Sequence, residues 1–152
     1  MYATKTPEVM DAGSMLLGRI TYEGFSAAWP GQEGDYADKM NAMPKAVVTS
    51  TRENLEWNST AISGDIREQI ETLKNDDSID GHILVYGSAT LARDLLDWGL
   101  VDELRLLIFP IAIGGGKSIW SSERTRNPMK LVESQVFDTG VIFAKYVPNT
   151  EP

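Results

Sequence analysis

Three short segments of the chain combine glycine, hydroxyl and arginine side chains in a way that suits phosphate binding. They are Gly18-Arg19-Ile20-Thr21, Ser50-Thr51-Arg52 and Gly87-Ser88-Ala89-Thr90-Leu91. Each follows an apolar run typical of a buried strand, and the first and third also open a helix pattern. Helix N-terminal amides attract anions, and the planar arginine guanidinium makes paired, charge-assisted bonds with phosphate. The simpler interpretation is that such segments are ordinary solvated connections between strands and helices.

The third segment ends the apolar run 83–86, which is continuous, as in strands that are covered on both faces. Gly87 permits a tight turn, and Ser88 is expected to cap the next helix by accepting a bond from a backbone N–H one turn later. A second helix is expected to begin at Asp65, with Glu68 completing the capping pattern. Further strands are expected at residues 14–17, 45–49, 59–63, 101–113, 131–137 and 141–147.

The order of these elements predicts one α/β domain over residues 1–152, with a central mixed, mainly parallel sheet that ends in an antiparallel C-terminal hairpin. The run 101–113 is expected to be a central strand that bends or ends near Pro110, because proline cannot donate to the ladder. Parallel strands end at one edge of a sheet, so the three polar segments are expected to meet there. A ligand with a pyrophosphate and a separate phosphate, as in NADPH, would use all three.

Composition narrows the class of protein further. The net charge is −8, with 22 acidic and 14 basic residues, which disfavours nucleic acid and anionic membranes as partners. The chain has no cysteine and one histidine, so no metal site is expected. It has no signal-peptide pattern and no apolar run near the ~20 residues of a membrane span, so a cytoplasmic protein is expected.

Several longer motifs resemble the dihydrofolate-reductase-like family, and most closely the reductase domain of the bacterial riboflavin-biosynthesis deaminase–reductase. The resemblance covers roughly residues 11–148, with the motifs in the family's order. It rests on Leu16-Leu17-Gly18-Arg19-Ile20-Thr21-Tyr22-Glu23-Gly24-Phe25, Trp29-Pro30, Asn41-Ala42-Met43-Pro44-Lys45, Val85-Tyr86-Gly87-Ser88-Ala89-Thr90-Leu91, Gly99-Leu100-Val101-Asp102-Glu103-Leu104-Arg105-Leu106 and Gly114-Gly115-Gly116-Lys117.

The resemblance implies a three-layer fold with helices on both sides of the sheet and a bound NADPH. A homodimer is also expected, with a small-molecule substrate as the other partner. It implies that Gly18, Arg19 and Thr21 contact the cofactor phosphates, and that residues 87–91 wrap the pyrophosphate. Ser50, Thr51 and Arg52 would hold the adenosine end and its 2′-phosphate. Tyr22 is a candidate substrate residue by its place after the first turn, and no residue is assigned as the proton donor.

Family members have a further strand and a Leu-Asp-Gly-type turn before the segment that matches residues 15–18. That strand lies in mid-sheet, so its absence would leave a slot between the strands at 83–86 and 101–109. Residues 1–9 could fill the slot, a second subunit could cover it, or the sequence could be part of a longer protein. Pro7 and the lack of alternation predict that residues 1–9 do not form the full first strand.

The leading hypothesis is an NADPH-dependent reductase that transfers hydride to a pyrimidine- or pterin-type substrate, similar to 5-amino-6-(5-phosphoribosylamino)uracil reductase. The alternatives are a non-catalytic NADP(H)-binding homodimer and a structural homodimer subunit with neither activity. His82 is interpreted as a surface or loop residue, and the adjacent acids Asp102 and Glu103 as structural or solvated.

Overall fold

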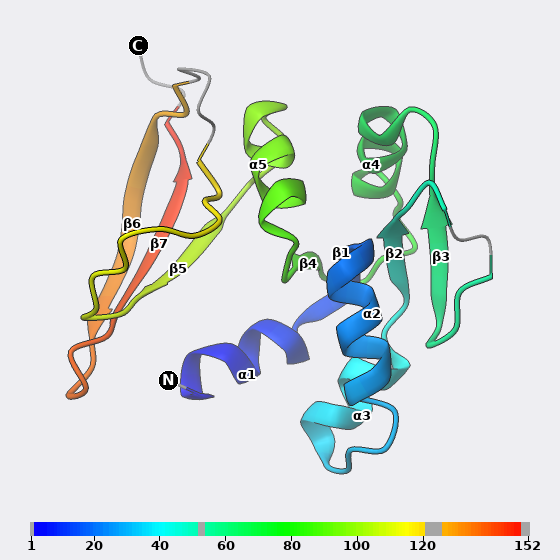
Figure 1. Cartoon of the computed structure of the whole chain (residues 1–152), viewed down its shortest axis with the longest axis horizontal. Coiled ribbons are helices and arrows are strands. Elements are labelled where there is room, and N and C mark those ends of the chain that lie inside the picture. The colour runs from blue at the N-terminus through cyan, green and yellow to red at the C-terminus, as the bar shows by residue number, and fades with distance from the viewer. Residues whose placement is uncertain (1, 52–53, 121–125, 150–152) are drawn as a thin grey trace. The chain divides into compact units, whose positions relative to one another are not determined.

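The computed structural model describes residues 2–51, 54–120 and 126–149. The chain divides into two compact units, Met1–Leu91 and Ala92–Pro152. Helix α5 (Ala89–Asp97) begins in the first unit and continues into the second. Figure 1 shows the elements of each unit, which are taken in turn below.

A parallel four-stranded sheet forms the centre of the first unit. Its strands are β1 (Ala12–Gly18), β2 (Lys45–Val48), β3 (Ser59–Ile62) and β4 (His82–Val85), in the order β3-β2-β1-β4. All three pairings are parallel. The side chains of β1 are buried on both faces, which explains its nearly unbroken apolar sequence.

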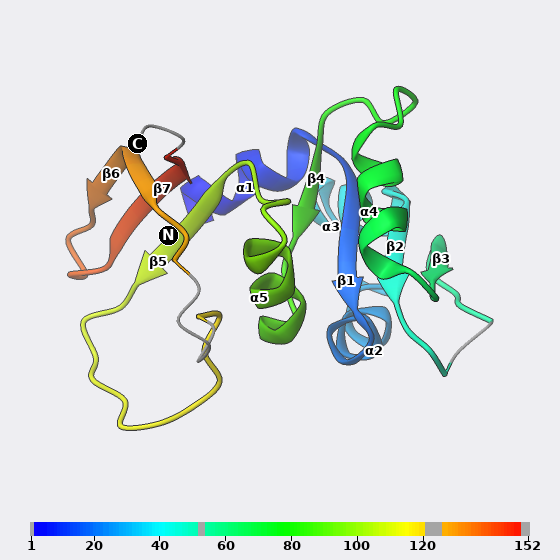
Figure 2. The same ribbon diagram turned by 90° about the horizontal axis from the view of Figure 1, so that it is seen from above.

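Helices cover both faces of this sheet (Figure 2). Three helices, α1 (Tyr2–Met10), α2 (Arg19–Ala28) and α3 (Asp35–Ala42), contribute Val9, Tyr22 and Met40 to the core. These side chains cluster with Met15 and Leu17 of β1. Helix α4 (Ile66–Lys74) lies on the other face of the sheet. The Asp65 carboxylate caps it by accepting a 3.0 Å bond from Glu68 N, as predicted.

The second unit contains the antiparallel strands β5 (Leu104–Ile108), β6 (Met129–Val136) and β7 (Ile142–Pro148), in the order β5-β7-β6. The predicted closing hairpin is therefore confirmed as β6 and β7. The parallel strands come first in the chain and the antiparallel strands last, also as predicted. Strand β4 is an edge strand of the parallel sheet, and strand β5 is an edge strand of the antiparallel sheet.

The expectation of one long central strand over residues 101–113 is wrong. Only Leu104–Ile108 is a strand, and it lies at an edge of its sheet. The strand does end just before Pro110, and Ile111 N donates to Phe109 O at 2.8 Å in a tight turn. An apolar run does not reveal its own register, and here the turn at Pro110 detaches the second half of the run from the ladder.

The N-terminal residues form a helix and not a strand. Helix α1 covers Tyr2–Met10 and continues to a backbone bond of 3.0 Å from Asp11 N to Pro7 O. The prediction that residues 1–9 do not supply the family's first strand is therefore confirmed. The prediction of a single domain over residues 1–152 stays a prediction.

Candidate functional site

The three polar segments follow strands that end at one edge of the parallel sheet. Gly18, the last residue of β1, lies opposite Val48, the last residue of β2. Leu16 lies opposite Val85, the last residue of β4. Because the three strands are parallel and adjacent, their carboxyl ends point the same way, which confirms the predicted meeting of the strand ends.

The first and third segments touch each other directly. Gly18 N donates to Gly87 O at 3.0 Å, and the Gly87–Ser88 peptide bond is cis. A Cβ atom on Gly18 would lie 2.8 Å from Ser88 Oγ, and one on Gly87 would lie 2.9 Å from Thr21 Oγ1. Gly87 also has φ +137°, which side-chain-bearing residues rarely adopt. Glycine at both positions therefore lets the two turns approach each other closely.

Two helices begin at this contact. Gly18 is the N-cap of α2, which has no side-chain cap and no acidic residue in its first turn. Ser88 Oγ accepts a 3.3 Å bond from Leu91 N, which confirms the predicted cap of α5. The first amides of both helices lack partners within the helix and lie at the positive ends of the helix dipoles. The edge thus presents two helix N-termini that suit negatively charged groups.

Arg19 is the first residue of α2, and its guanidinium is bound to a side chain of the same helix. Arg19 Nη1 donates to Glu23 Oε1 at 3.0 Å, and both side chains remain partly exposed. Glu23 was not among the site residues predicted from the sequence. Its position four residues after Arg19 was the available signal, because residues i and i+4 are neighbours on a helix surface.

The second segment is only partly described. Thr49, directly after β2, is buried, and its Oγ1 accepts a 3.3 Å bond from Thr51 N. Ser50 and Thr51 are exposed at the carboxyl edge of the sheet. Arg52 lies outside the described residues, so its assignment to a 2′-phosphate stays a prediction.

Tyr22 is a buried core residue, and its expected role as a substrate residue stays a prediction. Only 3% of its surface is exposed. Its hydroxyl donates to Glu56 O at 3.2 Å and accepts from Glu56 N at 2.9 Å. Tyr22 is the buried residue of α2, so its side chain faces the core of the first unit.

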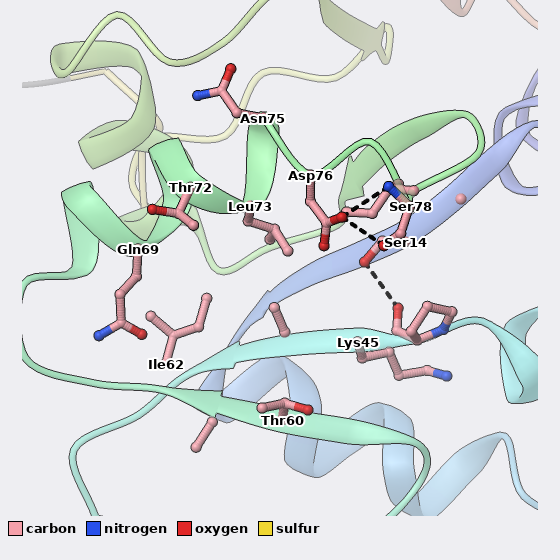
Figure 3. Close-up of a pocket in the computed structure, with 15 residues that line it drawn as sticks. Ser14, Lys45, Thr60, Ile62, Gln69, Thr72, Leu73, Asn75, Asp76 and Ser78 are labelled. Atoms are coloured by element: carbon pink, nitrogen blue, oxygen red, sulfur yellow. Dashed lines mark hydrogen bonds between the residues drawn. The ribbon is translucent and has the colours of Figure 1, made fainter.

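A cavity of about 650 Å³ opens between α4 and the opposite end of the sheet (Figure 3). None of the predicted cofactor residues lines it. Its polar side chains bond within the protein: Ser14 Oγ donates to Pro44 O at 3.2 Å, and Ser78 donates to Asp76 Oδ1 from both N and Oγ. The Ser78 bonds also lower the pKa of the Asp76 carboxyl. This cavity therefore offers few groups for specific recognition.

Lys45 borders the cavity, but its ammonium group binds the end of α3. Lys45 Nζ donates to Met43 O at 2.6 Å and to Asn41 O at 3.3 Å, and lies 4.0 Å from the centre of the Trp57 ring. Burial lowers the pKa of Lys45 to about 8. These contacts give Lys45 a structural role at the C-terminus of a helix.

The other titratable residues singled out in the sequence lie in structural contacts. A ring nitrogen of His82 is 2.9 Å from Glu8 O at the start of β4, away from the carboxyl edge. Glu103 pairs with Arg105 and with Lys145 across β5 and β7. Within residues 2–51, 54–120 and 126–149, no cluster of three or more acidic or histidine side chains could hold a metal ion. No helix in the same ranges is long and apolar enough to cross a membrane.

Known proteins include relatives of this chain that are similar in sequence or in structure. A curated relative, the uncharacterized protein YyaP of Bacillus subtilis (strain 168), is 28% identical over 138 residues, which are 88% of this chain and 72% of the relative. A putative riboflavin biosynthesis protein from Shewanella sp. PV-4 superposes with a TM-score of 0.74 at 19% identity, covering 93% of this chain and 76% of that one.

A second solved structure, RibD of Acinetobacter baumannii, superposes with a TM-score of 0.69 at 13% identity, covering 98% of this chain and 51% of that protein. The model of the RibD C-terminal domain matches residues 4–143, which is most of the chain. The chain therefore belongs to the RibD C-terminal domain family, whose reductase-like domains have the dihydrofolate-reductase-like α/β fold.

Proposed function

We propose that this protein is an NADPH-dependent reductase that transfers hydride to a pyrimidine- or pterin-type substrate. The observation that carries the proposal is the contact of the Gly18 and Gly87 turns at the carboxyl edge of the parallel sheet. A pyrophosphate needs backbone amides that a side chain does not cover, and glycines beside two helix N-termini leave such amides accessible. The site therefore fits the charged part of a dinucleotide.

Each of the three segments at this edge binds a different part of the cofactor. Gly18, Arg19 and Thr21 bind phosphate oxygens, and residues 87–91 surround the pyrophosphate. Ser50, Thr51 and Arg52 bind the adenosine end, where arginine would distinguish the 2′-phosphate of NADPH from the hydroxyl of NADH. The bound cofactor supplies the hydride, and the protein supplies its orientation.

The substrate class rests on the relatives. A solved structure from Corynebacterium diphtheriae is described as a pyrimidine reductase-like protein, and it superposes with a TM-score of 0.66 at 12% identity over 92% of this chain and 77% of that chain. Hydride transfer to an imine-like carbon of a pyrimidine-type substrate, similar to the reaction of 5-amino-6-(5-phosphoribosylamino)uracil reductase, is the reaction of this class that we propose.

The second candidate is a homodimeric NADP(H)-binding protein without catalytic activity. The burial of Tyr22 favours it, because Tyr22 was the one substrate residue that the sequence suggested. Both candidates require the cofactor site, and only the first requires oxidation of NADPH in the presence of a pyrimidine or pterin.

Titration with NADPH tests the cofactor site. We expect saturable binding by the wild type and at least about tenfold weaker binding by Gly18→Ala, because the added Cβ would force Ser88 to move. Gly24→Ala is the matched control: Gly24 lies in the same helix with nothing within 4 Å of an added Cβ, so its affinity should be unchanged.

Two further measurements separate the possibilities. Arg52→Ala should weaken the binding of NADPH and leave the binding of NADH unaffected. An equal loss of affinity for both would contradict the assignment of Arg52 to the 2′-phosphate. Absence of NADPH binding by the folded wild type contradicts both candidates. Binding without turnover on any pyrimidine or pterin leaves the non-catalytic one.

A further inference from the structure

The ion pair between Arg19 and Glu23 lies at the first turn of α2, beside the proposed phosphate site. The two charged atoms are 3.0 Å apart, and the side chains are 41% and 31% exposed. Solvent and ions therefore reach both groups. Such an exposed pair within one helix is weak, so another charged group at the site can displace either partner.

The pair also fixes the direction of the arginine side chain. Glu23 lies one turn further along α2, so the bond holds the Arg19 guanidinium along the helix surface in the C-terminal direction. The unpaired amides of α2 and the Gly87–Ser88 turn lie at the opposite, N-terminal end. In this arrangement the guanidinium is bound to Glu23 and is held back from the place where a phosphate would lie.

The charge distribution at this helix end favours an external anion. A cation at the first position of a helix is disfavoured by the positive end of the dipole, and α2 has no acidic residue in its first turn to offset it. An anion at the N-terminus would interact favourably with the amides, the dipole and Arg19 together. Glu23 satisfies Arg19 but leaves the amides without an acceptor.

We propose that Glu23 competes with the cofactor phosphates for Arg19 and thereby sets the affinity of the site. In the ligand-free protein Arg19 binds Glu23, and on binding the guanidinium turns to a phosphate oxygen. Glu23 lowers affinity twice, because it must release Arg19 and because its carboxylate repels the anion. This inference rests on the proposed function, since it assigns a role within the same site.

Glu23→Gln tests the competition. We expect about three- to tenfold tighter binding of both NADPH and inorganic pyrophosphate, since one nearby negative charge and one ion pair are removed. Glu71→Gln is the control, because Glu71 makes the same i, i+4 pair with Arg67 at 3.0 Å, in α4. It should leave both affinities within about twofold of the wild type.

A double-mutant comparison tests whether Glu23 acts through Arg19. In an Arg19→Ala background, the gain from Glu23→Gln should fall to about twofold or less, which is the repulsive part alone. A gain of the same size with and without Arg19 would overturn the competition, as would unchanged or weaker binding by Glu23→Gln in the wild-type background.

The outcomes distinguish this inference from the proposed function. If the wild type binds NADPH and Glu23→Gln binds it no better, only the competition fails. If pyrophosphate binds more tightly to Glu23→Gln but NADPH binds to neither protein, the competition holds and the dinucleotide assignment fails. If neither ligand binds to either protein, both are wrong.

Discussion

At the scale of single residues, the Tyr22 hydroxyl joins α2 to the chain segment that precedes β3. It bonds both backbone groups of Glu56, which lies 34 residues away in the sequence. Removing the hydroxyl in Tyr22→Phe leaves those groups without their partner, so we expect a loss of about 1 kcal/mol in the free energy of unfolding. Urea unfolding measures it.

The same variant should bind NADPH as the wild type does, within about twofold, because the buried ring faces the core. Tyr36→Phe is the control for removal of a tyrosine hydroxyl, since the Tyr36 ring packs on Trp29 with 5.5 Å between ring centres. A large loss of NADPH affinity in Tyr22→Phe, with an unchanged free energy of unfolding, would indicate that Tyr22 contacts the ligand.

Lys45 makes the stability of the protein depend on pH. Burial lowers the pKa of its ammonium from 10.5 to about 8 in the folded protein, so between these values the unfolded chain holds the proton more strongly. Stability that depends on Lys45 therefore rises as the pH increases from about 8 to 10.5. The charged form below pH 8 carries the full cost of its burial.

Comparison with Lys45→Met isolates this effect. The free energy of unfolding of the wild type, relative to that variant, should increase by about 1–3 kcal/mol between pH 7.5 and 10. Urea unfolding of both proteins at several pH values measures the difference. A difference that stays constant, or that shrinks with rising pH, would show that the carbonyl bonds and the Trp57 ring offset the burial of the charge.

The residues that sequence reasoning identified correctly act over short distances along the chain. Ser88 and Asp65 cap helices by bonds to residues three positions later, so the pattern and the contact are both local. The contacts of Tyr22 with Glu56, and of Lys45 with Trp57, join residues far apart in sequence or depend on side-chain direction. Periodicity alone does not contain that information.

At the scale of elements, the parallel strands and the C-terminal hairpin were more predictable than β5. Strands β1, β2 and β4 each end in a polar turn, and the rule that parallel strands end at one edge brought those turns together correctly. The end of β5 near Pro110 was predicted, but its short extent was not, because the apolar run around it has the composition of one long strand. Its place at a sheet edge depends on pairing with β7, which follows about 35 residues later.

Strand β4 is an edge strand although it follows the pattern of a buried one. Strand β1 is paired on both sides, by β2 and by β4, while β4 pairs with β1 alone in the described sheet. We therefore expect the amides of residues 83–85 to exchange with deuterium at least about tenfold faster, on average, than those of residues 15–17. Hydrogen exchange at low protein concentration measures both sets in one experiment.

Protection of the β4 amides from exchange would have a different meaning depending on whether it changes with protein concentration. Equal protection of β4 and β1 at every concentration would mean that another part of the polypeptide pairs with that edge. Protection that increases with protein concentration would identify a second copy as the partner. Residues 59–62 of β3, the other edge of this sheet, serve as the internal comparison.

At the scale of the whole molecule, the antiparallel sheet has one face that is unusually apolar for an exposed surface. Ile108, Ile142 and Val136 are cross-strand neighbours and are 47%, 39% and 72% exposed. The ion-paired row of Arg105, Lys145 and Glu133 lies an odd number of residues away on each strand, and hence on the opposite face. The apolar row is therefore free of charges that would oppose contact with another apolar surface.

We expect this apolar row to contribute to a homodimer. Val136→Lys should shift the protein toward monomer by at least about tenfold in dissociation constant, because it would bury an unpaired charge. Gln135→Lys is the matched control, since it adds the same charge on the same strand but on the other face. Sedimentation velocity over a range of concentrations measures both.

Because each copy carries a net charge of −8, added salt should strengthen association of the wild type by screening repulsion. A wild type that stays monomeric at high salt, or equal effects of the two lysines, would exclude this face as the interface.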